Sequence, residues 1–351
     1  MKKIISLILA VAISATCLCG CGAKKAGAND GKFEIVTTIF PEYDWVMNIL
    51  GDNPGKAQVT MLLDKGVDLH SYQPTADDIL KISTCDVFIY VGGESDEWVA
   101  DALKEAVNED MIVINLLDTL GDAAREEELV EGMQGEEHDH EEGEDHEDGD
   151  EHEDDEDHED GDEHEHEHEE GEVEYDEHVW LSLKNASALT KEISEAIIKA
   201  DSDNADTYRK NTEEYIGKLD ALDKEYEDAV ASAECKTLLF GDRFPFRYMT
   251  EDYGLDYYAA FIGCSAETEA SFETITFLAG KVDELGLKTI LTIESSDGKI
   301  AQTIAENASA SGLEILSMDS MQSTTSKDVK EGCSYLKIME KNLEVLKKAL
   351  K

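Results

Sequence analysis

Short runs of β-branched and aromatic residues alternate with helical stretches along most of this 351-residue chain. In the first third of the chain, strands are expected at Phe33–Ile39, Ala57–Leu63, Asp86–Val91 and Met111–Leu116. Helices are expected between them, at Tyr43–Leu50, Thr75–Ile82 and Glu97–Asn108. Strands that alternate with helices form parallel sheets covered by helices. The sequence therefore predicts an α/β fold.

The same alternation returns in the last third of the chain. There, strands are expected at Thr237–Phe240, Tyr257–Phe261, Thr289–Ile293 and Glu314–Met318. Between the two parts, Leu183–Ala200 is predicted to be a helix, and Asn204–Ala233 a longer amphipathic helix of about 45 Å. The prediction is two α/β lobes, each with a parallel sheet flanked by helices, over 33–202 and 234–351. One long helix, 203–233, joins them.

A tract of 35 residues interrupts the first lobe. From Glu136 to Glu170 the chain contains only 24 acidic residues, 8 histidines and 3 glycines. Such a segment has no apolar residue to bury and strong self-repulsion, so 136–170 is predicted to be a disordered loop. Imidazoles and carboxylates bind transition metals, which favours weak binding at several sites over a purely solubilising role.

The first residues have the pattern of an export signal. Lys2 and Lys3 precede an apolar run that is too short to span a bilayer comfortably, which predicts a signal peptide over 1–20. The sequence LCGC, ending at Cys21, resembles a bacterial lipobox. Cys21 is then the lipidated first residue of the mature protein, and 21–32 is a polar tether at the outer face of the cell membrane. The alternative is an ordinary signal peptide.

The net charge limits the classes of binding partner, and the cysteines suggest one disulfide. The formal net charge of −52 argues against a nucleic-acid partner, because phosphates would be repelled. Cys264 and Cys333 both lie in loop-like sequence beside glycine, and they are the preferred disulfide pair, which an extracytoplasmic location permits. Cys85 precedes a predicted strand and is expected to be buried.

Only two histidines lie outside the tract. His70, in GVDLHSYQPTADD, follows the second predicted strand, and His178, in YDEHVWLS, precedes the helix after the tract. Loops at strand ends are where α/β proteins usually build their sites. A single loop histidine is more often a surface residue than a metal ligand. The hypothesis of a metal site therefore depends on the two histidines together.

Several ordered motifs resemble one known family. They are GVDLHSYQPTADD, DEHVWLS, NADTYRKNTEEYIGKLDALD, AAFIGCSAETEASF and LEILSMDSM, and they extend over nearly the whole chain after the signal peptide. Together they resemble the zinc/manganese substrate-binding proteins of ABC importers, the cluster A-I solute-binding lipoproteins. The resemblance implies two α/β lobes bridged by a rigid helix, with a metal in the cleft. The histidine-rich insertion is typical of the zinc members.

The resemblance also implies metal ligands by position. His70 corresponds to the first-lobe histidine after the second strand, and His178 to the histidine of the D-x-H-x-W motif. At the third ligand position this chain has FGDRFPF and no histidine, and Asp242 is the nearest residue that could bind. Asp319, after the last strand, corresponds to the fourth ligand. Glu294, which follows another strand, competes for either of the last two roles.

A set of two histidines and two aspartates suits zinc, with manganese as the alternative. No H-E-x-x-H, G-x-S-x-G or phosphate-loop motif is present, which disfavours a secreted metallohydrolase. A surface protein for metal storage or adhesion is a further alternative. The expected role is a monomeric zinc receptor that docks on an integral-membrane permease, with a separate ATPase driving transport.

Overall fold

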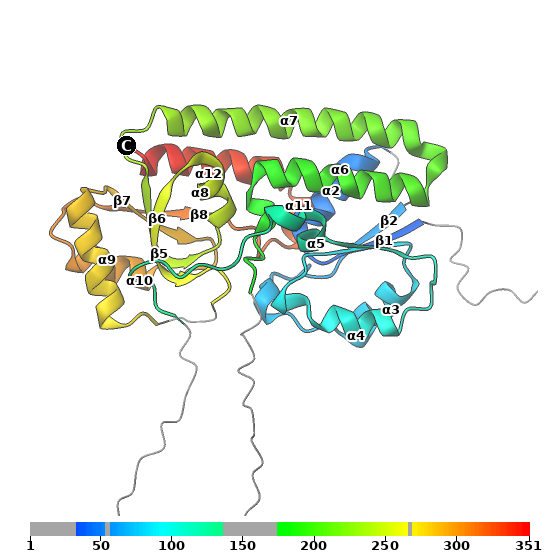
Figure 1. The fold of residues 1–351 in the computed structure, drawn as a ribbon, viewed down its shortest axis with the longest axis horizontal. Helices are drawn as coiled ribbons and strands as arrows, with labels where there is room; N and C mark the ends of the chain where they lie inside the picture. The colour runs from blue at the N-terminus through cyan, green and yellow to red at the C-terminus, as the bar shows by residue number, and fades with distance from the viewer. Residues whose placement is uncertain (1–32, 53–56, 136–173, 266–268) are drawn as a thin grey trace, which may run out of the picture.

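The computed structural model describes residues 33–52, 57–135, 174–265 and 269–351, which form two lobes bridged by a long helix (Figure 1). The prediction of two α/β lobes is confirmed. The predicted signal peptide, the tether with Cys21, and the tract 136–170 lie outside the described residues. None of the helices in the described part of the chain has the length and apolar character that crossing a bilayer requires.

The N-terminal lobe is built on a four-stranded parallel sheet with strand order β2-β1-β3-β4. Its strands are β1 (Phe33–Thr37), β2 (Ala57–Met61), β3 (Val87–Tyr90) and β4 (Ile112–Asn115). Its helices are α2 (Phe40–Leu50), α3 (Ala76–Thr84), α4 (Trp98–Lys104), α5 (Leu116–Leu120) and α6 (Leu183–Ala200). Side chains define the helix starts: Thr75 and Asp78 form a capping box on α3, and Ser182 caps α6.

The C-terminal lobe repeats this arrangement with strand order β6-β5-β7-β8. Its strands are β5 (Thr237–Phe244), β6 (Asp256–Ile262), β7 (Thr289–Ile293) and β8 (Glu314–Met318). Its helices are α8 (Arg247–Tyr253), α9 (Phe272–Leu285), α10 (Lys299–Asn307), α11 (Ser326–Lys330) and α12 (Tyr335–Ala349). All strand pairs are parallel, as predicted.

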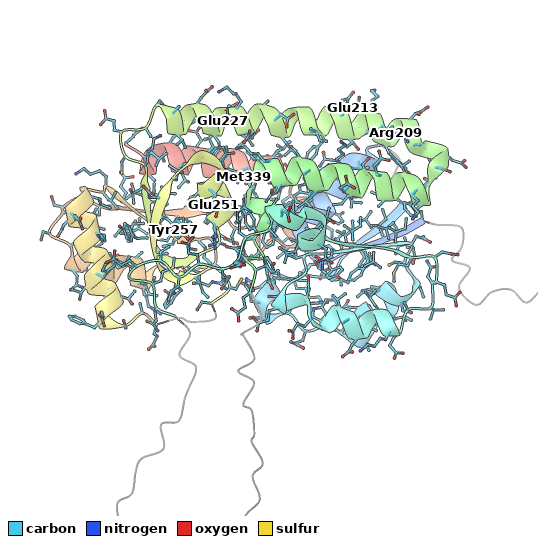
Figure 2. All side chains as sticks on the ribbon, viewed as in Figure 1. Arg209, Glu213, Glu227, Glu251, Tyr257 and Met339 are labelled. Atoms are coloured by element: carbon cyan, nitrogen blue, oxygen red, sulfur yellow. The ribbon has the colours of Figure 1, made fainter. Side chains whose placement is uncertain are left out.

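Helix α7 (Ala205–Ala231) lies along one side of both lobes (Figure 1). Its inner face is buried, and its outer face carries exposed Arg209, Glu213 and Glu227 (Figure 2). At one end the Asn211 amide donates to the carbonyl of Ile49 in α2, at 3.0 Å. At the other end the Tyr226 hydroxyl donates to the carbonyl of Met339 in α12, at 2.7 Å. The helix is therefore hydrogen-bonded to both lobes.

One continuous apolar core extends through both lobes. It includes Ile35 and Trp180 from the first lobe and Phe240 and Met318 from the second. Two hydrogen bonds cross the boundary between the lobes. The Trp180 indole donates to the carbonyl of Ser320 at 2.9 Å, and the Tyr335 hydroxyl donates to the carbonyl of Trp180 at 2.6 Å. This shared core favours small relative motions of the lobes.

The chain crosses between the lobes before the histidine-rich tract begins. Residues 125–135, counted with the first lobe in the sequence analysis, run along the second lobe in the structure (Figure 1). Gln134 pairs in parallel with Phe261 of edge strand β6, and its N–H donates to the carbonyl of Ala260 at 2.9 Å. The segment also places Glu127 beside the loop that follows β6.

Candidate metal site

His70 lies in a single 3-10 turn, Leu69–Ser71, between β2 and α3. The turn is capped by Asp68, whose carboxylate accepts the His70 backbone N–H at 3.1 Å. Two contacts of its Nδ1 atom fix the orientation of the His70 ring. Nδ1 lies 2.8 Å from the Ser95 hydroxyl and 3.4 Å from a Glu177 carboxylate oxygen. The opposite nitrogen, Nε2, therefore faces the space between the lobes.

His178 is completely buried at the start of the turn that leads into α6. One Asp176 carboxylate oxygen contacts both its backbone N–H and its Nδ1, each at 2.9 Å. Its ring packs beside that of Trp180, with centroids 5.3 Å apart. Its Nε2 lies 3.2 Å from the Nε2 of His70. The two predicted histidines, 108 residues apart in the sequence, are thus brought together.

In both rings Nδ1 is held by a neighbouring group and Nε2 faces the partner ring. Metal-bound histidines have this arrangement, because a carboxylate or hydroxyl on one nitrogen fixes the tautomer and leaves the other nitrogen free to bind. Two zinc–nitrogen bonds of about 2.05 Å at a tetrahedral angle hold their nitrogens about 3.3 Å apart. The observed separation of 3.2 Å fits that spacing.

Cys264 lies beside the two imidazoles, in the loop after β6. Its sulfur and the two histidine nitrogens all lie within 4.8 Å of one another. In the described part of the chain, these two histidines and one cysteine form a group that could hold a metal ion. Sequence reasoning did not assign Cys264 to this site. Its position at the end of a parallel strand was the signal that could have suggested it.

The predicted disulfide between Cys264 and Cys333 is wrong, because all four cysteines of the described residues are free. The two thiols have different surroundings. The Cys264 backbone N–H donates to Glu127 at 3.3 Å at the cleft, whereas Cys333 lines a separate hollow with Asp319 and Lys341. Burial and nearby acidic groups raise the pKa of the Cys264 thiol well above its usual value.

The structure does not place Asp242 in the cluster. Strand β5 continues four residues past its predicted end at Phe240 and includes Asp242, with an irregular register there. The Asp242 carboxylate accepts the backbone N–H of Arg243 at 2.9 Å, and it lies beside Ser296 in the turn after β7. Burial raises its pKa.

Asp319 and Glu294 also make other contacts. Asp319 accepts the backbone N–H of Met321 at 2.8 Å and lines the hollow with Lys341, and burial together with the Glu294 carboxylate raises its pKa to about 6. Glu294 accepts the Ser320 backbone N–H at 2.7 Å and the Ser323 hydroxyl at 3.2 Å. Both carboxylates thus stabilise the loop after β8 and do not reach the imidazoles.

That loop directs Gln322 at the histidine pair. The Gln322 amide nitrogen lies 3.4 Å from Nε2 of His70 and closer still to Nε2 of His178. Its amide oxygen is buried and has no hydrogen-bond partner in the part of the chain that the structure describes. The neighbouring Met321 has φ +66°, and it is the one non-glycine with positive φ among the described residues. Strained backbone of this kind often accompanies a functional site.

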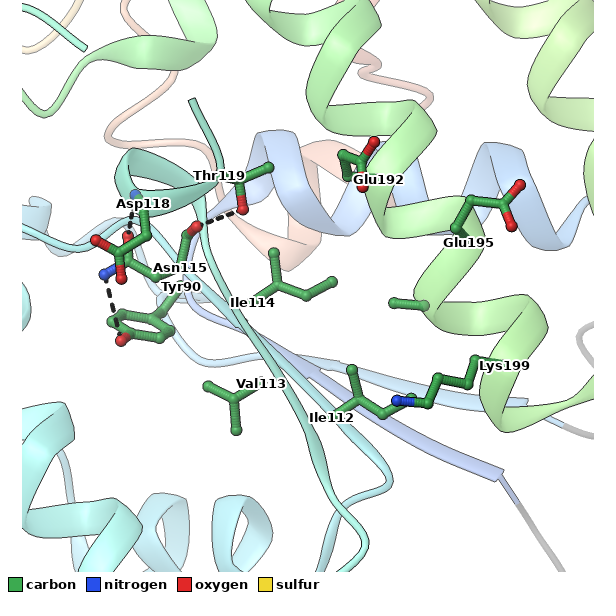
Figure 3. Close-up of a pocket in the computed structure, with 11 residues that line it drawn as sticks. Tyr90, Ile112, Val113, Ile114, Asn115, Asp118, Thr119, Glu192, Glu195 and Lys199 are labelled. Carbon is green, nitrogen blue, oxygen red and sulfur yellow. Dashed lines mark hydrogen bonds between the residues drawn. The ribbon is translucent and has the colours of Figure 1, made fainter. Parts of the chain in front are cut away.

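The cluster opens into a cavity of about 940 Å³ between the lobes. Acidic side chains line it, including Glu127, Glu174 and Glu177, so the cavity attracts cations. Burial raises the pKa of Glu127. Another hollow, of about 530 Å³, lies between β4 and α6 (Figure 3). Its lining contains no histidine or cysteine, so it lacks the donors of the first.

The fold and the site define a class: a bilobed α/β protein with metal-type donors between its lobes. The chain belongs to the family described as zinc-uptake complex component A, periplasmic, whose model matches residues 35–349. The resemblance seen in the sequence is therefore confirmed.

The zinc-binding protein AdcA of Streptococcus pyogenes serotype M3 is 30% identical over 327 residues, which cover 91% of this chain and 56% of the relative. This chain thus spans little more than half the length of that relative. The high-affinity zinc uptake system protein ZnuA of Bacillus subtilis is 30% identical over 345 residues, 98% of this chain and 96% of the relative.

Solved structures have the same fold. The Zn(II)-bound ZnuA-like domain of Streptococcus pneumoniae AdcA is 27% identical, with a TM-score of 0.65 over 91% of this chain and 99% of that domain. The metal-dependent lipoprotein YcdH of Bacillus subtilis is also 27% identical, with a TM-score of 0.68 over the same shares of the two chains.

Proposed function

We propose that this chain is an extracytoplasmic receptor that captures zinc between its lobes and delivers it to an ABC importer. The spacing of the two imidazoles carries the proposal: their Nε2 atoms lie 3.2 Å apart and each Nδ1 is held by a neighbour. The relatives named above for zinc binding or zinc uptake support the choice of zinc over manganese, the alternative cargo. The role is binding and release, not catalysis.

The remaining parts of the proposal concern delivery. Lipidation at Cys21 would hold the receptor at the outer face of the membrane, and one relative, of Streptococcus pneumoniae, is named a zinc-binding lipoprotein. A monomer would then dock on an integral-membrane permease whose ATPase drives transport.

The histidine-rich tract would collect metal for the cleft. Gly135 and Glu174, the described residues on either side of the undescribed segment, both line the cavity that contains His70. Metal released from the tract would therefore enter solution close to the site, at a raised local concentration.

Calorimetric titration of zinc, and separately of manganese, into the full chain tests the proposal. We expect one tight zinc site that survives deletion of residues 136–170 and disappears in His70→Ala. Arg209→Ala, on the exposed face of α7, is the matched control and should bind as the parent does. Loss of all tight zinc binding on deletion of the tract would contradict a site between the lobes.

A further inference from the structure

The donors from the second lobe decide which metals the cleft can hold. His70 and His178 come from the first lobe, and the acidic residues expected to complete the site, Asp242 and Asp319, make other contacts. Two side chains of the second lobe lie at the imidazoles, Cys264 and Gln322.

We propose that Cys264 is the third metal ligand of this chain and makes the cleft selective for zinc against manganese. The inference rests on the proposed function and deepens it. Three donor atoms within 4.8 Å of one another can share one ion, because zinc binds nitrogen at about 2.0–2.1 Å and sulfur at about 2.3 Å.

The loop around Cys264 is positioned by contacts on both sides. Gly263 is so close to His178 that a Cβ added there would lie 3.0 Å from the ring. On the other side the Cys264 backbone N–H donates to Glu127, from the segment that crosses between the lobes. Backbone packing at Gly263 and the hydrogen bond to Glu127 therefore position the sulfur beside the imidazoles.

Gln322 provides a second, independent sign of a ligand at this point. The residue is 6% exposed, its amide nitrogen contacts both Nε2 atoms, and its amide oxygen has no hydrogen-bond partner among the described residues. Buried polar atoms are rarely left unpaired. Rotation of the amide would turn this oxygen towards the ion and complete a four-donor set with the two imidazoles and the thiolate.

The donor type sets the selectivity. Thiolate is a soft ligand that binds zinc well, whereas manganese prefers carboxylates and other oxygen donors. The cysteine binds as the thiolate, so its proton is released as the metal enters. A cleft with two imidazoles and a thiolate thus favours zinc, and the acidic residues around it act by long-range attraction.

Cobalt(II) titration into the full chain tests this inference, because thiolate bound to cobalt gives a near-ultraviolet charge-transfer band. We expect the band in the parent and in Cys333→Ser, a control at another free cysteine, and its absence in Cys264→Ser. Chelator competition should show that Cys264→Ser binds zinc at least about 100-fold more weakly, with manganese affinity changed by less than about threefold. Cys264→His should restore zinc affinity without the band.

A band that persists in Cys264→Ser would overturn the inference. So would tight zinc binding by the parent without a band, an outcome that leaves the proposed receptor function standing. If neither the parent nor Cys333→Ser binds zinc or cobalt tightly, the proposed function fails together with the inference. Thermal unfolding with chelator present shows whether each variant is folded. If Cys264→Ser does not fold, Cys264→His still tests the inference.

Discussion

At the scale of single residues, Gly263 is where the second lobe comes closest to the His178 ring. A Cβ at this position would lie 3.0 Å from two ring atoms and 3.0 Å from the carbonyl oxygen of Phe244. Because the backbone cannot yield easily, the ring must move, and metal sites tolerate shifts of only about 0.5 Å. We expect Gly263→Ala to weaken zinc binding about tenfold, measured by chelator competition.

The same substitution in an open position is the control. Gly280 lies exposed in α9, where an added Cβ meets nothing within 4 Å. Gly280→Ala should leave zinc affinity unchanged, and it should stabilise the helix by up to about 1 kcal/mol. Equal losses of affinity in the two variants would show that the contact with His178 is not the cause.

Asp176 controls the second imidazole through hydrogen bonding. One of its oxygens contacts both the backbone N–H and Nδ1 of His178, so the carboxylate fixes the ring and makes Nε2 a better donor. Asp176→Asn keeps the shape and removes the charge. We expect a 10- to 100-fold loss of zinc affinity by calorimetry. Asp203→Asn, an exposed aspartate before α7, should have no effect; an unchanged Asp176→Asn would mean that the charge is not needed.

Of the four expected ligands, the structure brings two side by side, His70 and His178. His70 and His178 were found because each lies within an ordered motif near a strand end or helix start. Asp242 was expected just after a strand but lies within β5, and Asp319 directly follows β8; at both positions the direction of the side chain depends on local irregularities. The register shift in β5 turns Asp242 towards Ser296, and the strained loop at Met321 directs Gln322, not Asp319, at the imidazoles. Neither irregularity has a signature in residue type.

At the scale of elements, Asp44 joins three helices. It lies on α2, and its carboxylate accepts hydrogen bonds from the Tyr215 hydroxyl of α7 at 3.3 Å and the Tyr335 backbone N–H of α12 at 3.2 Å. The side chain is 8% exposed, and burial raises its pKa to about 6. The junction between the bridging helix and both lobes therefore contains a carboxyl that titrates near neutral pH.

The raised pKa predicts a pH-dependent stability. The unfolded value is about 3.9, so the folded protein retains a proton between about pH 4 and pH 6 that the unfolded chain has released. Stability therefore falls as pH rises through this window, and the full cost above pH 6 is about 2–3 kcal/mol. In Asp44→Asn this cost is absent. The unfolding free energy of the variant, relative to that of the parent, should therefore increase as the pH rises from 4 to 6.

Urea unfolding with chelator present, over pH 4 to 7, measures this difference. Chelator is needed because bound metal would stabilise both proteins by mass action. Asp203→Asn is the exposed control and should keep a constant offset from the parent at every pH. A pH-independent offset for Asp44→Asn as well would show that Asp44 does not titrate in this range.

Element boundaries were predicted best where local chemistry decides them. Strands β7 and β8 and helix α6 begin and end at the predicted residues. Helix α4 ends at Lys104, four residues before its predicted end, because the N–H groups of Val107 and Asn108 both donate to the carbonyl of Ser83 and turn the chain. This tertiary contact overrides helix propensity and could not be foreseen from the sequence.

At the scale of the whole molecule, the two lobes are linked by an ion pair beside the metal site. Arg243 of β5 donates to Asp68 of the His70 turn at 2.7 Å, and the side chains are 15% and 23% exposed. Although burial alone would raise the pKa of Asp68, the Arg243 guanidinium lowers it below its usual value. Since Asp68 also caps the turn that carries His70, this pair connects lobe arrangement to ligand position.

A double-mutant cycle measures how strongly this pair holds the lobes together. We expect Arg243→Met and Asp68→Asn to be coupled by about 1 kcal/mol in unfolding free energy, because partial burial limits screening. The exposed pair of Lys104 and Asp101, also 2.7 Å apart, is the matched control, and its coupling should be indistinguishable from zero. Because the donor–acceptor distance is equal in the two pairs, distance cannot account for a difference in coupling. Zero coupling for Arg243 and Asp68 would mean that the shared apolar core and α7 alone hold the lobes in place.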